Sequence, residues 1–188
     1  MTKFIRKTII FVFIISFCFS VSAGEFSKED AERIANFLKK AKKLKRKNLF
    51  LRKVSFTEKE FNSYINLIYI KRYASEAKYV HLNLERKNKI SGKMNLKLIG
   101  KKYSKIPSFL RDIEVKFSGI IESENYKMRF IFTKIFINDT EYSPQILDEA
   151  FAAYQVKQKI KKSMFDWFNL LPGLRNVKIT KRQILLFY

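Results

Sequence analysis

The chain contains 188 residues, with 39 lysines and arginines against 17 aspartates and glutamates and a formal net charge of +22. This length suffices for one domain with its own apolar core. A single cysteine excludes an internal disulfide framework, and because Cys18 lies in a leader segment that we expect to be cleaved, a cysteine-ligated metal centre is excluded as well. The positive charge favours anionic partners such as lipid headgroups, polyanionic glycans or nucleic acid. A compositional bias towards lysine would produce the same charge without a function.

The first 23 residues have the pattern of a secretory signal peptide. Three basic residues before position 8 precede an apolar run from Ile9 to Phe19, and small residues end at Ala23. The apolar run is shorter than the roughly 20 residues that a membrane-spanning helix needs, although an uncleaved anchor is the alternative. We therefore expect cleavage after Ala23, export to the periplasm or beyond, and a single α+β domain over residues 24–188. Export makes nucleic acid an unexpected partner.

A first helix is predicted from Ser27, which can act as its N-cap, to about residue 46. The end of this helix is strongly basic. Cations there suit the helix dipole and a solvated face, and the alternative interpretation is contact with an anionic surface. The candidates for that contact, including two from a later helix, are Lys39, Lys40, Lys42, Lys43, Lys45, Arg46, Lys157 and Lys161.

A second helix has the sharpest start signal in the chain. Residues 49–56 read as a short strand, after which Thr57 can be the N-cap and Glu60 the N3 residue of a capping box. Phenylalanines on either side of this box can form a hydrophobic staple. The helix is expected to continue to about Lys71.

Alternating apolar and polar residues then predict antiparallel strands. Residues 79–84 and 90–98 alternate strictly on both sides of Lys87 and Asn88, which indicates a hairpin with one buried face. Gly92 suggests a bulge or bend inside the second strand.

A second pair of strands is predicted at residues 113–121 and 128–137. The buried phase of the latter slips at Thr133 and Lys134, which is the pattern of a β-bulge. Together, the bulge or bend at Gly92 and the bulge at Thr133 favour a curved sheet over a flat one.

The most prominent predicted element is a long helix. Ser143 can be its N-cap and Pro144 its first residue, and Pro172–Gly173 ends it after Leu171. Roughly 25 residues at 1.5 Å each give about 37 Å of helix with an apolar stripe. The remaining residues, 177–188, predict a last hairpin or one bent strand. The predicted fold class is therefore α+β: a curved antiparallel sheet of about five to seven strands wraps this long helix, with two helices before it.

No catalytic pattern accompanies these elements. His81 is the only histidine and lies on the polar phase of a strand, and the five glycines are scattered rather than gathered in a phosphate-binding loop. The acidic pairs flank strands or begin a helix, as solvated residues do. We therefore expect a protein that is not an enzyme and that uses no cofactor and no metal.

The order of these elements resembles that of a known class. Residues 56–64, FTEKEFNSY, resemble the helix start of small exported bacterial proteins that have been compared with tubular lipid-binding, or TULIP-like, domains. Residues 135–139, 144–147 and 171–173, together with the closing strand, look similar to later parts of those proteins. The resemblance implies a long helix cradled by a curved sheet, with an apolar groove between them for acyl chains.

Two functions follow as hypotheses. The first is a non-enzymatic carrier or sensor of lipid or another apolar or anionic amphipathic ligand, unless the bulky aromatic side chains fill the groove. The second is a cell-envelope module that binds an anionic membrane surface, a polymer or an acidic protein through its basic face. The candidates for lining the groove are Met94, Leu96, Phe117, Phe130, Phe132, Phe151, Tyr154 and Ile160.

Overall fold

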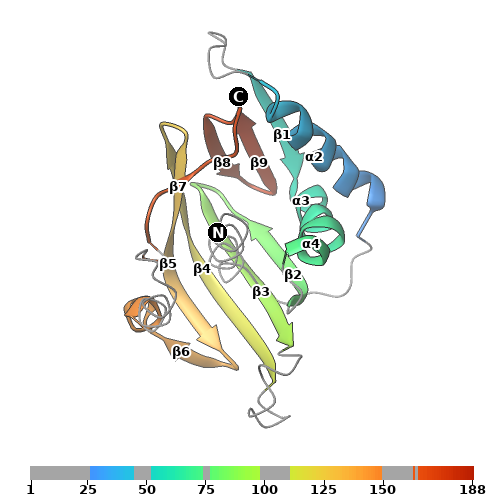
Figure 1. The fold of residues 1–188 in the computed structure, drawn as a ribbon. Coiled ribbons are helices and arrows are strands. Elements are labelled where there is room, and N and C mark those ends of the chain that lie inside the picture. The colour runs from blue at the N-terminus through green and yellow to red at the C-terminus, as the bar shows by residue number, and fades with distance from the viewer. Residues whose placement is uncertain (1–25, 45–51, 74–76, 98–110, 150–162, 164) are drawn as a thin grey trace, which may run out of the picture.

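Two antiparallel sheets and a small helical layer form the described part of the protein (Figure 1). Sheet A has six strands in the order β2-β3-β4-β5-β6, with β7 paired to β5 as well, and sheet B has three strands in the order β1-β9-β8. Buried side chains of both sheets belong to one apolar cluster, so the sheets share a core. The computed structural model describes residues 26–44, 52–73, 77–97, 111–149, 163 and 165–188.

Sheet A is built mainly from the two predicted hairpins. Lys87 and Asn88 both have a φ of 59°, as the central residues of a tight hairpin turn require. The turns at Asn125–Tyr126 and Asn138–Asp139 also have positive φ angles. The strands are β2 (Ala77–Leu84), β3 (Lys89–Lys97), β4 (Asp112–Glu124), β5 (Lys127–Ile137), β6 (Thr140–Tyr142) and β7 (Phe168–Asn169).

One of the two predicted bulges is confirmed. Ser118 pairs with Lys134 and the next residue, Gly119, pairs with Phe132, so β5 carries one extra residue at Thr133. At Gly92, where a bulge or a bend was suggested, the bulge is wrong, because this residue keeps regular register with both neighbouring strands. A glycine lacks a side chain but retains both backbone hydrogen-bonding groups, so it can occupy a regular ladder.

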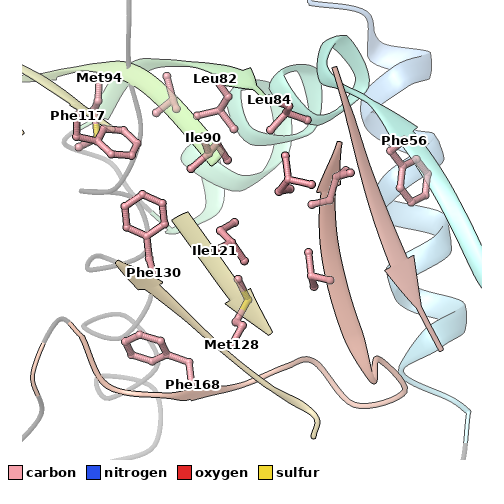
Figure 2. Close-up of a cluster of buried hydrophobic side chains, with 14 of the residues drawn as sticks. Phe56, Leu82, Leu84, Ile90, Met94, Phe117, Ile121, Met128, Phe130 and Phe168 are labelled. Atoms are coloured by element: carbon pink, nitrogen blue, oxygen red, sulfur yellow. The ribbon is translucent and has the colours of Figure 1, made fainter. Parts of the chain in front are cut away.

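Sheet B closes the molecule by joining distant parts of the sequence. Its strands are β1 (Lys53–Thr57), β8 (Asn176–Thr180) and β9 (Gln183–Phe187), and β9 pairs with both of the others. Of the two alternatives predicted for the last residues, the hairpin is confirmed and the single bent strand is not. Helix α2 (Lys28–Ala41) covers Phe56 of β1, whose ring centroid lies 5.5 Å from that of Phe37. Figure 2 shows Phe56 beside this helix, and Leu84, Ile121 and Met128 on the side of sheet A that lies toward sheet B.

The two sheets are joined by backbone contacts at their turns. The Asn88 N–H donates to the Ile179 carbonyl at 3.3 Å, and the Asn88 Oδ1 accepts from the Ile179 N–H at 2.8 Å. The Asn88 carbonyl accepts from Ile121 of β4 at 2.9 Å. The Tyr126 N–H donates to the Arg175 carbonyl at 3.1 Å in the same manner. The hairpin turns of sheet A therefore dock on β8 and on the segment before it.

The helical layer begins at the predicted capping box. Helix α3 (Glu58–Tyr64) continues through the π-helical η1 (Ile65–Tyr69) into α4 (Ile70–Tyr73). The Thr57 Oγ1 accepts from the Glu60 N–H at 3.2 Å, and the Glu60 Oε2 accepts from the Thr57 N–H at 2.6 Å. Ser27 caps α2 as predicted, through a 3.3 Å bond from the Asp30 N–H.

Side chains of this layer pair with the outer edge of β2. Asn62 donates from Nδ2 to the Leu82 carbonyl at 3.0 Å, and its Oδ1 accepts from the Leu82 N–H at 2.8 Å. Asn66 makes the same two bonds with Val80, at 2.6 and 2.8 Å. Four helical residues rise about 6 Å and two strand residues about 6.6 Å, so the spacings match. The helix thereby replaces a neighbouring strand.

The predicted long helix is wrong in its C-terminal part. The chain is helical over residues 144–149, residues 150–162 lie outside the described residues, and Phe168–Asn169 forms β7 instead. Phe168 is buried opposite Met128 of β5. This apolar residue was predicted to lie on the apolar stripe of the long helix, but it belongs to a strand. A short apolar run cannot by its spacing alone distinguish a helix from a buried strand.

The predicted fold class is corrected in the same way. The described residues form mostly strand, in two antiparallel sheets of six and three strands with short helices, rather than one curved sheet around a long helix. Gly173 was predicted to stop the long helix. It instead lies against the end of α2, where a Cβ atom would stand 1.9 Å from the Ala41 carbonyl oxygen.

Candidate functional site

Exposed cations gather where α2 ends and β1 begins, a region that we call the basic end. Arg52 exchanges two 2.9 Å backbone hydrogen bonds with Tyr188, and Gly173 packs on Ala41, so these segments lie together. Figure 1 shows the end of α2, the start of β1 and the chain's C-terminus at one end of the molecule. The exposed side chains of the basic end are Lys39, Lys40, Lys42, Lys43, Arg52 and Lys53.

The local sequence explains why part of this region is basic. Helix α2 has Glu29 and Asp30 in its first turn and Lys39 and Lys40 in its last, an arrangement that suits the helix dipole. Within the part of the chain that the structure describes, the ion pairs lie elsewhere, and none includes a side chain of the basic end. These six charges are therefore presented to solvent together.

Four of the eight predicted anionic-surface residues lie in the basic end, namely Lys39, Lys40, Lys42 and Lys43. The others, Lys45, Arg46, Lys157 and Lys161, lie outside the described residues. Sequence reasoning missed Arg52 and Lys53. Their position beside α2 depends on the pairing of β1 with β9, and no local sequence pattern predicts this pairing.

The outer face of sheet A differs from the basic end because its charges are mixed. Glu114 forms ion pairs with Lys93 and Lys116, and Lys116 also pairs with Asp139. Burial alone would raise the pKa of Glu114, but hydrogen bonds from the two lysines hold it below its usual value. The pKa of Lys116 is raised, mainly by its hydrogen bond to Asp139. His81 is half-buried on this face, opposite Lys93.

The predicted groove residues that the structure describes lie on the opposite, inner face of sheet A. Met94, Leu96, Phe117, Phe130 and Phe132 are all buried in the shared core, and Phe151, Tyr154 and Ile160 lie outside the described residues. Figure 2 shows Met94, Phe117 and Phe130 pointing into this space.

Four rings on this inner face form an aromatic cluster, which consists of Phe117, Phe130, Phe132 and Phe165. The centroids of Phe130 and Phe132 lie 4.5 Å apart, those of Phe117 and Phe130 lie 5.4 Å apart, and Phe165 adds a contact to Phe132 at 6.4 Å. The contacts are edge-to-face, as aromatic quadrupoles favour. Phe165 was expected on the long helix rather than in a turn beside β5.

A surface pocket of about 360 Å³ lies at the junction of the two sheets, and we call it the junction pocket. Its walls come from the tip of the β4–β5 hairpin, the start of β8 and the end of β9. Sequence reasoning missed it, because each wall was assigned to a separate turn or strand. The lining residues are Asn125, Tyr126, Arg175, Asn176 and Phe187.

Comparison of the chain with protein-family models, with curated proteins and with solved structures finds no match. Among the described residues, no group of three or more His, Cys, Asp or Glu side chains could hold a metal ion. In that same portion, no helix has both the length and the apolar character needed to cross a membrane. The basic end, the aromatic cluster and the junction pocket are thus the candidate binding features of the described residues.

Proposed function

We propose that this protein is an exported binding protein of the cell envelope that attaches to an anionic membrane surface through its basic end. The observation that carries the proposal is the grouping of six exposed cations without an ion-pair partner among the described residues. Each lysine or arginine close to an anionic leaflet adds about 1 kcal/mol of attraction. Attachment should therefore be reversible and should weaken as salt screens the charges.

The test is co-sedimentation of the protein with vesicles of phosphatidylglycerol and phosphatidylcholine, compared with pure phosphatidylcholine. Replacing Lys39, Lys40, Lys42 and Lys43 by Gln should weaken binding to the anionic vesicles at least tenfold. The matched control changes four exposed lysines away from the basic end to Gln, with the same loss of net charge. These control positions are Lys71, Lys97, Lys134 and Lys181.

The comparison separates a local surface from the overall charge. Binding that the control variant retains within about threefold, and that the basic-end variant loses, supports the proposal. Equal losses in the two variants, or binding that does not depend on phosphatidylglycerol, would reject it.

Carriage of a lipid or another apolar ligand is a second candidate, favoured by the aromatic cluster on the inner face of sheet A. The described rings are mostly buried, so they occupy the space that an acyl chain would need. We therefore rank this function second. Native mass spectrometry of gently purified protein tests it. The absence of co-purified lipid, together with no uptake of a fluorescent fatty acid, would rule this candidate out.

A further inference from the structure

The junction pocket lies at the same end of sheet B as the basic end. Lys53 pairs in register with Phe187, and Phe187 pairs with Asn176 on its other side. Two of these three residues line the pocket, and the third belongs to the basic end. A ligand in the pocket would therefore lie beside the surface that we propose to face anionic lipid.

Backbone hydrogen bonds hold the walls of the pocket in place. The Tyr126 N–H donates to the Arg175 carbonyl at 3.1 Å, and the Arg175 N–H donates to the Phe187 carbonyl at 2.7 Å. The Tyr126 carbonyl accepts from the Leu170 N–H at 2.8 Å. Tyr126 has a φ of 64°, as the second residue of a tight hairpin turn requires, and these bonds hold that turn against β8 and β9. The pocket is thus preorganised by contacts between the two sheets.

The chemistry of the lining suits a phosphate group. Arg175 supplies a guanidinium, whose planar fork of donors matches phosphate oxygens. The Asn176 Oδ1 already accepts from the Val177 N–H at 2.7 Å, so the NH₂ group is the part of this side chain that can bond a ligand. Asn125 adds a second amide. None of the five lining residues is acidic, so the lining itself adds no carboxylate that would repel a phosphate.

The size of the pocket limits the ligand further. A volume of about 360 Å³ is at the lower end of the range for small-molecule sites. It fits a phosphate with a small polar substituent, and it does not fit a whole acyl chain. Tyr126 and Phe187 offer apolar walls against which the carbon atoms of such a substituent can pack.

We propose that the junction pocket binds one phosphate-bearing headgroup, with Arg175 as its cation and the amides of Asn125 and Asn176 as additional donors. This inference deepens the proposed function and rests on it for the source of the ligand. The basic end then supplies general attraction to the membrane, and the pocket supplies recognition of a single phosphate.

The test is an NMR titration of the purified protein with glycerol 3-phosphate, inorganic phosphate and uncharged glycerol. Glycerol 3-phosphate should shift the amide signals of the pocket residues saturably, in the low millimolar range, and glycerol should not. Arg175→Gln should weaken this binding at least tenfold. Lys178→Gln, at an exposed position on β8, is the control and should leave it unchanged.

A second variant tests the proposal even if Arg175→Gln does not fold. Asn125→Asp introduces a negative charge at an exposed turn position, where a φ of 46° suits Asp as well as Asn. It should abolish the glycerol 3-phosphate shifts without disturbing the rest of the spectrum. Unchanged binding by this folded variant would overturn the proposal, as would non-saturable shifts up to 20 mM ligand in the unmodified protein.

The same variants distinguish the two sources of phosphate and the two proposals. A lipid headgroup predicts that Arg175→Gln weakens phosphatidylglycerol vesicle binding, and that inorganic phosphate binds more weakly than glycerol 3-phosphate. A free-phosphate site predicts equal affinity for the two phosphates and no effect on vesicles. If glycerol 3-phosphate does not bind in the pocket but the four-lysine variant still loses vesicle binding, only the headgroup site is rejected. If the pocket binds but vesicles do not depend on the basic end, only the proposed function is rejected.

Discussion

At the residue scale, single polar side chains carry much of the long-range order in this protein. Asn88 joins the β2–β3 turn to both β4 and β8 through three hydrogen bonds, and it does so in the left-handed conformation. The sequence predicted the turn at Lys87 and Asn88 from the alternation on either side. It did not predict the bonds to Ile179, because these link residues 91 positions apart.

Asn88 should be sensitive to substitution for two separable reasons. Asn88→Gly keeps the positive φ but removes the acceptor for the Ile179 N–H, and it should cost about 1–2 kcal/mol of unfolding free energy. Asn88→Ala also strains the backbone and should cost about 1–2 kcal/mol more. Urea denaturation measures both, with the exposed Lys178→Ala as a control. Equal effects of the two variants would contradict the role of backbone conformation.

Glu60 predicts how stability depends on pH. Burial alone would raise its pKa, but hydrogen bonds from Thr57 and Arg33 outweigh burial, so the folded-state pKa lies below the usual value. The stabilisation is therefore complete above the unfolded-state pKa of about 4.3 and is lost as pH falls through the folded-state pKa. Glu60→Gln should flatten the decline in stability below about pH 5.

Urea midpoints at pH 7, 5, 4 and 3 measure this dependence. The informative quantity is the difference between the unmodified protein and Glu60→Gln, because Asp112 and Glu114 also have lowered pKa values and contribute with the same sign. Parallel pH curves for the two proteins would show that Glu60 does not cause the effect.

At the scale of elements, the structure protects strand edges with side chains. Glu58, Asn62 and Asn66 follow one another at four-residue intervals and bond Leu84, Leu82 and Val80 of β2. Arg33 of α2 reaches the Ser55 carbonyl of β1 at 3.3 Å. Unpaired edges are templates for pairing with other chains. Helices therefore serve here as edge covers as well as parts of the core.

Removing one amide of this ladder should expose a defined backbone position. Asn62→Ala leaves the Leu82 N–H and carbonyl buried without partners, which should cost about 2–4 kcal/mol. Hydrogen exchange should accelerate at the Leu82 amide more than at Val80, which Asn66 still bonds. The exposed Asn36→Ala in α2 is the control and should change stability by less than about 0.5 kcal/mol. Uniform acceleration across β2 would argue against local protection.

Local signals predicted the elements that depend on local physics. The caps at Ser27 and Thr57, the β2–β3 turn and the bulge at Thr133 were all predicted correctly, because each is encoded within a few residues. Strand β6 was missed, since its three residues are all exposed and lack alternation. Asn62 was missed as a buried residue, because its partner Leu82 lies on another element.

At the scale of the whole molecule, the two sheets form one structural unit. Ile179 of β8 is 1% exposed and belongs to the same buried cluster as the core of sheet A. The division into two sheets could not be predicted from the sequence, because β1 and β9 read equally well as members of one sheet. The junction pocket and the position of Arg52 and Lys53 follow from that pairing, and so they were missed with it.

A shared core predicts that damage to sheet B weakens sheet A. Ile179→Ala should cost about 2–5 kcal/mol and lower the unfolding midpoint of the whole molecule in a single transition. Ile146→Ala, at a side chain that is 58% exposed, is the control and should change stability little. Circular dichroism and fluorescence of Trp167 should report coincident transitions. Separate transitions would show that the two sheets unfold independently.

The pairing of β1 with β9 also governs when the protein can finish folding. Residues 53–57 can pair only after residues 183–187 have been synthesised. The β4–β5 hairpin likewise can dock on the Arg175 carbonyl only after Arg175 has been synthesised. Contacts of such high sequence separation form slowly, because the intervening chain must first be closed into a loop. A partly synthesised chain therefore retains an unfinished second sheet. This delay is compatible with the export that we propose, in which the chain would cross a membrane before it folds.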